Sequence, residues 1–254
     1  MSSWCDKLGS TPAAGVTLST HFVTALRLLD AFAPILDLHE ERTRAAFTVD
    51  EADNFSVTFN TNDGYKYGAD HRRVHVTFNH RMRAKNVSGG APIMEMLSEP
   101  LPYTQLLPKT LAKLTEAALL IPKRESRTIS RVGIVSTTVV SEDIVPPGIA
   151  RMLSWMGKPW GKLTDGFSIQ LTAEIDRKPG WTDRCAHTLL RTEHAEDLLT
   201  LVFDFQRTYN IEKPVQQAAM SEIFGETERA ALRYFEDLAE GNRFDEIDVG
   251  HKAG

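Results

Sequence analysis

The chain has 254 residues, of which 42% are hydrophobic and 25% charged, and its net charge is −5. These values are typical of a globular protein with a large buried core, and they exclude a disordered or fibrous chain. The negative balance also excludes a protein whose whole surface binds nucleic acid, although a local basic patch is compatible with it.

Two cysteines, Cys5 and Cys185, are the complete set, and they form no CxxC or metal-ligand spacing. Such sparse cysteine usage indicates a reducing compartment. The chain has neither a signal-peptide pattern nor eighteen consecutive apolar residues. We therefore expect a soluble cytoplasmic protein with no membrane segment.

The first part of the chain predicts a loose leader over residues 1–16, followed by an α+β half over 17–98. A first helix is predicted to begin at Ser19 or Thr20, either of which is a suitable N-cap, and to end or kink at Pro34. Alternating apolar and polar residues then predict an antiparallel meander of short strands. Its strands fall near residues 45–49, 55–59, 65–67 and 74–78.

A central amphipathic helix is predicted over about residues 103–121, because its leucines recur at helical spacing. The helix face consists of Leu107, Leu111, Leu114, Ala118 and Ile121. Pro122 then ends the helix, and a strand follows from Ile129 to Val140. Apolar residues on both sides of this strand predict an interior strand covered on two faces.

The second half, residues 99–254, repeats the order of the first: a helix leads into several strands, and a helix follows them. A short helix over 149–156 is expected to close at Gly157, and a final helix, with Ser221 as its cap, to stop at Gly241. Strands are predicted over 167–176, 185–190 and 199–205. The fold class is α+β with mainly antiparallel meandering sheet, packed as one compact body.

A cluster of methionine and tryptophan lies between the proline pair at 146–147 and the loop after residue 160. It consists of Met152, Trp155, Met156 and Trp160. Such residues form adaptable contact surfaces of large area, so the cluster is the leading candidate for binding a partner protein. The alternative is that these side chains belong to the core.

A basic strand face is the second candidate, for an anion or nucleic acid. If the strand at Val74 continued to residue 85, its alternate positions would align five basic side chains. These are Arg73, His75, Arg81, Arg83 and Lys85. The alternative is an ordinary solvated sheet face.

Catalytic and metal motifs are absent from the sequence, which carries no GxSxG or cysteine–histidine signature. His71 and His75 lie on a turn and a strand, where a four-residue spacing does not converge on a metal. We therefore assign no catalytic residue, metal or cofactor. A third alternative, an unrecognised hydrolytic site, would use the acids Glu174, Asp176 and Asp204.

Four segments resemble a large, sporadically distributed prokaryotic family of about this length that has no assigned function. They are residues 55–70, the helix 103–121 running into Arg131-Val132-Gly133-Ile134, the strand 199–205 with Asp204, and the closing helix through Phe235. In that family the arginine is typically followed by a Gly-Leu-Arg-Tyr-like run, which this chain replaces from Val135 to Thr137. The resemblance implies an α+β protein, often in mobile or defence-related gene neighbourhoods, with no catalytic residues to transfer.

These observations favour a non-catalytic binding or adaptor protein that recognises another protein. An anion- or nucleic-acid-binding protein and a hydrolytic enzyme remain as alternatives.

Overall fold

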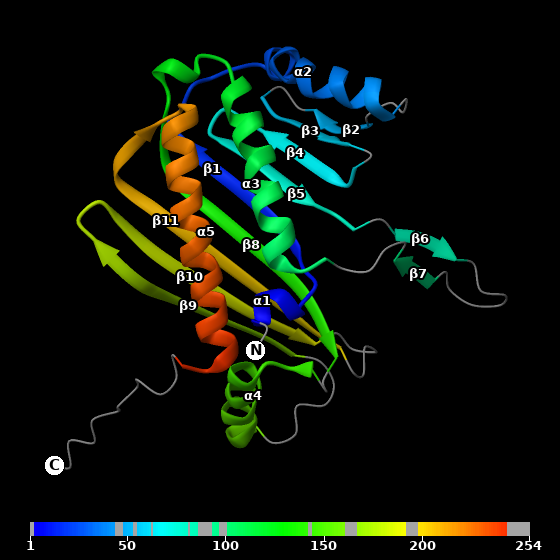
Figure 1. The fold of residues 1–254 in the computed structure, drawn as a ribbon, viewed down its shortest axis with the longest axis vertical. Coiled ribbons are helices and arrows are strands. Elements are labelled where there is room, and N and C mark those ends of the chain that lie inside the picture. Colours follow the sequence, from blue (N-terminus) through cyan, green and yellow to red (C-terminus); the bar gives the residue numbers. More distant parts are fainter. Residues whose placement is uncertain are drawn as a thin grey trace.

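A nine-stranded antiparallel sheet runs through the whole protein (Figure 1). The structure, a computed structural model, describes residues 3–43, 48–52, 55–61, 63–80, 82–85, 93–96, 101–141, 144–160, 167–191 and 198–242. The strand order is β2-β3-β4-β5-β1-β8-β11-β10-β9, and β6 pairs with β7 in a separate two-stranded sheet. The predicted α+β class with a mainly antiparallel sheet is confirmed.

The order of strands divides the chain between residues 126 and 128, and the two parts on either side are called halves from here on. Among the described residues, the first half contributes one central strand, a meander, three α-helices and a 3₁₀ helix. Its elements are α1 (Trp4–Lys7), β1 (Thr11–Leu18), α2 (Ala25–Thr43), β2 (Thr48–Ala52), β3 (Val57–Asn60), β4 (Tyr65–Ala69), β5 (Arg73–Phe78), β6 (Met82–Lys85), β7 (Ile93–Met96), α3 (Tyr103–Leu120) and the short 3₁₀ helix η1 (Arg124–Ser126). The second half consists of β8 (Thr128–Ser141), α4 (Pro147–Trp160), β9 (Phe167–Lys178), β10 (Trp181–Arg191), β11 (Leu198–Pro214) and α5 (Gln217–Glu240).

The two halves have a similar order of elements. From its central strand, β1 or β8, each half continues through a helix and a meander that returns to pair beside that strand, and then reaches a long helix. Within the described residues, α1, β6, β7 and η1 have no counterpart in the second half. The halves join where β1 and β8 pair antiparallel, with Gly15 opposite Gly133. His75 lies opposite Gly15 on β5, and Gln206 lies opposite Gly133 on β11, so these two residues hold equivalent places.

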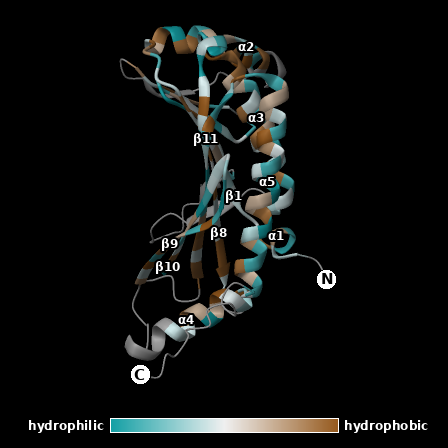
Figure 2. Ribbon diagram, turned by 90° about the vertical axis from the view of Figure 1, so that its left-hand side faces the viewer, coloured by the Kyte–Doolittle hydropathy of each residue, from teal (hydrophilic) through white to brown (hydrophobic). Residues whose placement is uncertain are grey.

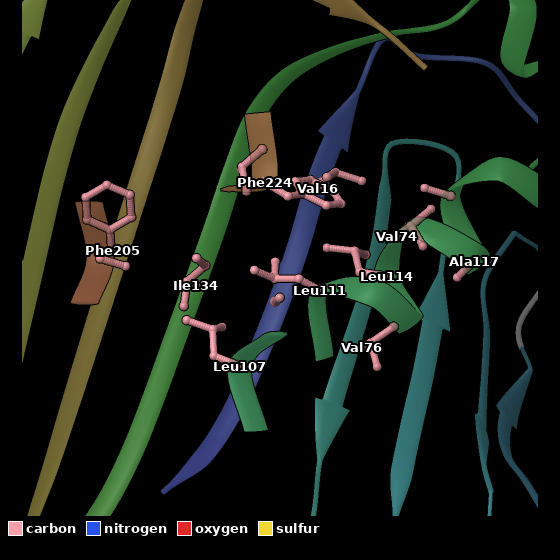
Figure 3. Packing of buried hydrophobic residues seen from close by; sticks show 14 of the residues in the cluster. Val16, Val74, Val76, Leu107, Leu111, Leu114, Ala117, Ile134, Phe205 and Phe224 are labelled. Atoms are coloured by element: carbon pink, nitrogen blue, oxygen red, sulfur yellow. The ribbon is translucent and has the colours of Figure 1, made fainter. Parts of the chain in front are cut away.

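The long helices α3 and α5 cross the same face of the sheet, with α1 beside them (Figures 1 and 2). The leucines predicted to face the sheet do so: Leu107, Leu111 and Leu114 are buried. They pack towards Val16 and Ile134 on the two central strands (Figure 3). The opposite face carries no described helix, and we call it the open face.

Strand β8 corrects one prediction. It is an interior strand, lying between β1 and β11, but within the described residues helices cover one of its faces only (Figure 2). Val132 and Ile134 are fully buried beneath the helices, whereas Val139 on the open face is 59% exposed. Apolar residues on both sides of a strand therefore did not imply two covered faces here.

Four element boundaries also differ from the predictions. The predicted leader contains α1 and β1, the latter at the centre of the sheet. Helix α2 begins at Ala25 and continues past Pro34, whose exposed position lets water satisfy the carbonyl that loses its helical partner. Helix α4 likewise continues through Gly157. Helix α5 begins before Ser221, but it ends as expected at Gly241, whose φ is 87°.

None of the helices in the described ranges combines the length and the apolar character that crossing a bilayer requires.

Candidate functional site: a hollow on the open face

A shallow hollow lies at the centre of the open face, where β1 and β8 meet. Successive side chains of a strand point to opposite faces, so odd-numbered residues of both strands point away from the helices. The floor is formed by small residues, Ala13, Gly15 and Gly133. The hollow has a volume of about 190 Å³ and is open to solvent.

Three rows of cross-strand neighbours build the walls of this hollow. The first row consists of Arg73, Thr17 and Arg131; the second of His75, Gly15, Gly133 and Gln206; and the third of Thr77, Ala13 and Val135. Asp204 lies opposite Val135, beside the hollow. Adjacent strands lie about 4.8 Å apart, so the backbones carrying the two arginines are about 10 Å apart. Polar side chains thus surround a flat apolar floor.

The two ends of the hollow differ in charge. At one end the Nε of Arg131 donates a hydrogen bond to Oγ1 of Thr17, at 3.2 Å, and Arg73 is exposed nearby. Within the described residues, neither arginine forms an ion pair with an acid. At the other end Nε2 of Gln206 donates to both carboxylate oxygens of Asp204, at 2.9 and 3.1 Å. The hollow therefore has one cationic end and one end that carries an acceptor.

His75 lies flat against the backbone of β4. A methyl group on Gly68 would overlap with the imidazole, so a glycine is required at that position for the ring to take this place. Contact with the neighbouring strand removes water from the ring, and this lowers the pKa of His75, with Lys66 and Arg73 adding to the effect against Asp70. The neutral imidazole is therefore favoured over the charged one, although His75 keeps part of its surface exposed.

The predicted basic face is divided by the structure. Arg73 and His75 lie on β5 in the main sheet, whereas Arg83 and Lys85 lie on β6 in the small sheet. Arg81 is outside the described residues, and so are the side chains of β6. Arg73 and His75 are instead joined by Arg131, which sequence reasoning did not select, since only the order of strands brings it to the same face.

The methionine and tryptophan cluster is only partly at the surface. Met152 is 4% exposed and belongs to the core, while Trp155 is 50% exposed on α4. The side chains of Met156 and Trp160 are outside the described residues. Partner binding by this segment stays a prediction, with Met152 unavailable for direct contact.

The three acids considered for hydrolysis form separate contacts. Glu174 pairs with Arg177 and Arg184, Asp176 with Lys178 at 3.6 Å, and Asp204 bonds to Gln206. Strand β10 lies between the strand of Glu174 and that of Asp204. These contacts provide no shared pair of carboxylates for acid–base chemistry.

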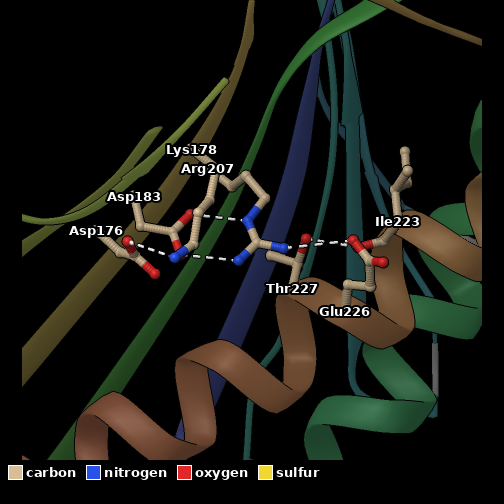
Figure 4. Close-up of polar contacts among 7 residues, drawn as sticks. All are labelled: Asp176, Lys178, Asp183, Arg207, Ile223, Glu226 and Thr227. Atoms are coloured by element: carbon tan, nitrogen blue, oxygen red, sulfur yellow. Dashed lines mark hydrogen bonds and ion pairs between the residues drawn. The ribbon is translucent and has the colours of Figure 1, made fainter. Parts of the chain in front are cut away.

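A second polar cluster lies on the helix side of the sheet, between β10, β11 and α5 (Figure 4). Arg207 donates from Nε and Nη2 to the carboxylate of Asp183 at 2.7 and 2.8 Å, and the two side chains are 4% and 0% exposed. The guanidinium also stacks on Trp181, 3.9 Å from the ring centre, and its Nη1 lies 3.6 Å from Glu226. Burial alone would lower the pKa of Arg207, but the hydrogen bonds and charge of Asp183 outweigh this and raise it.

This buried pair anchors α5 over the sheet, next to an open cleft of about 530 Å³. The sequence carries a signal for it. Asp183 is in phase with the core-facing Cys185 on β10, and Arg207 is in phase with Phe203 and Phe205 on β11. A charged residue in phase with core residues on each of two strands predicts a buried ion pair once the strands are known to be neighbours.

In the part of the chain that the structure describes, no three His, Cys, Asp or Glu side chains gather in a way that could hold a metal ion. What remains is a sheet with one face covered by helices (Figure 2) and the other presenting a hollow lined by polar side chains. Comparison with protein-family models, with curated proteins and with solved structures finds no match.

Proposed function

We propose that the protein is a non-catalytic binding protein that holds a nucleic-acid strand on its open face, with phosphates bound by Arg73 and Arg131. The observation that carries this proposal is the placement of these arginines on either side of Thr17, on an uncovered face, above a floor of glycine and alanine. Arginine pairs with phosphate through two parallel hydrogen bonds, which makes it the preferred residue for this contact.

The shape of the hollow favours a polymer over a free small molecule. Sites for small ligands usually enclose about 300–1,000 Å³ and bury most of the ligand, and this hollow is smaller and open. A nucleic-acid strand that continues beyond the hollow on both sides also contacts the surface outside it, so it does not need to be enclosed by the hollow. The flat floor of Gly15 and Gly133 lets a sugar or base approach the backbone closely.

The opposite end of the hollow suits the base of a nucleotide. Asp204 accepts hydrogen bonds, while Gln206 and Thr77 both accept and donate them, as the edges of bases require. A phosphate at the arginine end and a base edge at the Asp204 end would orient the bound strand.

One further observation supports this function over partner binding by the methionine and tryptophan cluster, and a second bears on the compartment. Met152 is buried, so the methionine and tryptophan cluster offers less surface for a partner protein than its sequence suggests. Cys5 and Cys185 form no disulfide, which supports a reducing compartment such as the cytoplasm as part of the proposal.

The test is fluorescence anisotropy with labelled single-stranded DNA, single-stranded RNA and duplex DNA, each titrated with the full chain at several salt concentrations. Replacing Arg73 or Arg131 by glutamine should weaken binding about 10- to 100-fold, since a hydrogen bond to a charged group contributes about 1.5–3 kcal/mol. Each change should also reduce the salt slope by about 0.7 for a single strand.

The matched control is Arg27→Gln, which removes an arginine from α2 that is exposed, as Arg73 is, and lies away from the open face. The proposal fails if the unmodified chain binds none of the three probes at low salt. It also fails if Arg27→Gln weakens binding as much as Arg73→Gln and Arg131→Gln do.

A further inference from the structure

Strand β9 forms one edge of the sheet. It pairs with β10 along one side, and no strand within the described residues pairs along the other. All twelve residues, Phe167–Lys178, are at least partly exposed. The backbone N–H and C=O groups of alternate residues therefore point outward from a long edge, which is a template for another strand.

The face of β9 towards the helices is apolar and only partly covered. Phe167, Ile169, Leu171 and Ala173 share this face, in register with the buried Leu189 and Cys185 of β10. Helix α5 packs on β11 and β8, further into the sheet. Leu171 is consequently 41% exposed, at the point where the sheet would need one more strand to enclose it.

Structural features that prevent edge-to-edge pairing occur only at the C-terminal end of β9. Natural edges are protected by charged side chains and by bulges. On β9 a bulge occurs next to Ile175, and the charged residues Asp176, Arg177 and Lys178 follow it. The segment Phe167–Ala173 has neither protection.

We propose that a second copy of this chain pairs with β9, antiparallel, with Leu171 opposite the partner's Leu171. In this register Ile169 lies opposite the partner's Ala173 on the apolar face, and Gln170 lies opposite the partner's Thr172 on the polar face. Ser168 faces the partner's Glu174, where hydroxyl and carboxylate can bond. Shifting the centre to Ala173 would instead place Ile169 opposite the partner's Arg177 and interrupt the apolar stripe. A centre at Gln170 also keeps the stripe apolar, and the cysteine variants below distinguish it from the centre at Leu171.

The symmetry axis of this pair is perpendicular to the sheet. Both copies therefore keep their helices on one side and their open faces on the other, and the two sheets become one continuous sheet. Its two hollows would lie on the same side, so that one long ligand could bind both, with the gain in affinity that bivalent binding brings. The pairing itself does not depend on what the hollow binds.

The oligomeric state of the full chain tests the pairing. Sedimentation velocity over a wide concentration range should show a dimer, and Leu171→Lys should convert it to a monomer, because two like charges would face each other across the axis. Leu171→Glu should do the same, and an equimolar mixture of the two variants should dimerise again. A chain that is monomeric throughout the range overturns the proposal, leaving another protein's strand as the occupant of this edge.

Engineered cysteines test the register. Antiparallel neighbours have Cα atoms about 4.5–5.5 Å apart, within the range of a disulfide. Leu171→Cys alone should therefore give an oxidised dimer, as should a mixture of Ile169→Cys and Ala173→Cys chains. Ile169→Cys alone is the control, because its two copies would be about 13 Å apart. Equal cross-linking in the control would overturn the register, and a dimer that neither Leu171→Lys nor Leu171→Cys affects would overturn the site.

Discussion

Replacing Arg207 by methionine should destabilise the protein more than almost any other single change of a charged residue. The carboxylate of Asp183 is fully buried, and Arg207 is its bidentate partner. Methionine retains much of the side-chain volume but removes both hydrogen bonds and the positive charge. A buried carboxylate would remain without compensation.

The cost should be about 3–5 kcal/mol, the usual effect of removing one member of a buried ion pair. Loss of the guanidinium from the Trp181 ring adds about 1 kcal/mol. Replacing both members, Arg207→Met with Asp183→Leu, removes the buried charge as well, and should return the free energy of unfolding to within about 2 kcal/mol of the unmodified protein. The matched control is Arg184→Met, whose exposed ion pair with Glu174 should contribute less than about 1 kcal/mol.

The assay is urea unfolding followed by circular dichroism, with the free energies compared in a double-mutant cycle. A pH series adds a second readout. Burial raises the pKa of Asp183, and Arg207 opposes that rise. Without the arginine the folded state binds a proton more readily than the unfolded state, so the deficit of Arg207→Met should shrink as the pH falls from 8 towards 5. Additive costs in the cycle, or a deficit that is independent of pH, would refute a coupled buried pair.

Two further predictions concern the hollow and the junction of α4 with α5. Because the pKa of His75 is lowered, the folded protein binds a proton at this imidazole less readily than the unfolded chain does. The contribution of His75 to stability is therefore fully present above about pH 6.5 and is lost as the pH falls below that value. His75→Gln should remove this dependence in melting experiments between pH 5 and 8, and an unchanged dependence would exclude His75 as its source. A Cβ on Gly148 would overlap the carbonyl of Leu238 and lie 2.6 Å from the nitrogen of Gly241. Gly148→Ala should therefore cost at least about 1–3 kcal/mol of unfolding free energy, while Gly180→Ala, with no atom within 4 Å of the new Cβ, should cost less than about 0.5 kcal/mol; equal costs would contradict this packing.

The spacing of apolar residues predicted those elements whose buried face is defined by residues close together in the sequence. Leu107, Leu111 and Leu114 define the buried face of α3 because helical spacing alone brings them together. The extent of helices was less predictable, since Pro34 and Gly157 are tolerated inside α2 and α4. Tertiary packing outweighs the local preference of these residues to end a helix.

Strand order was the information that the sequence lacked. Arg73 and Arg131 lie far apart in the chain. They come close to each other only because β1 pairs with the strand of Arg73 on one side and with the strand of Arg131 on the other. The same order places Asp183 opposite Arg207. Val139 is exposed because no second layer of helices covers the open face within the described residues. The pattern of residues within β8 cannot predict whether such a layer exists.

The seam between β1 and β8 joins two modules with a similar order of elements, residues 11–120 and 128–240. Either module by itself would end at a bare central strand, and each supplies what the other needs to complete the sheet. Gly15 comes from one module and Gly133 from the other, so the floor they share exists only once the modules are joined. Whatever this floor accommodates thus depends on the joining of the two modules, and a change that loosens the seam would remove it.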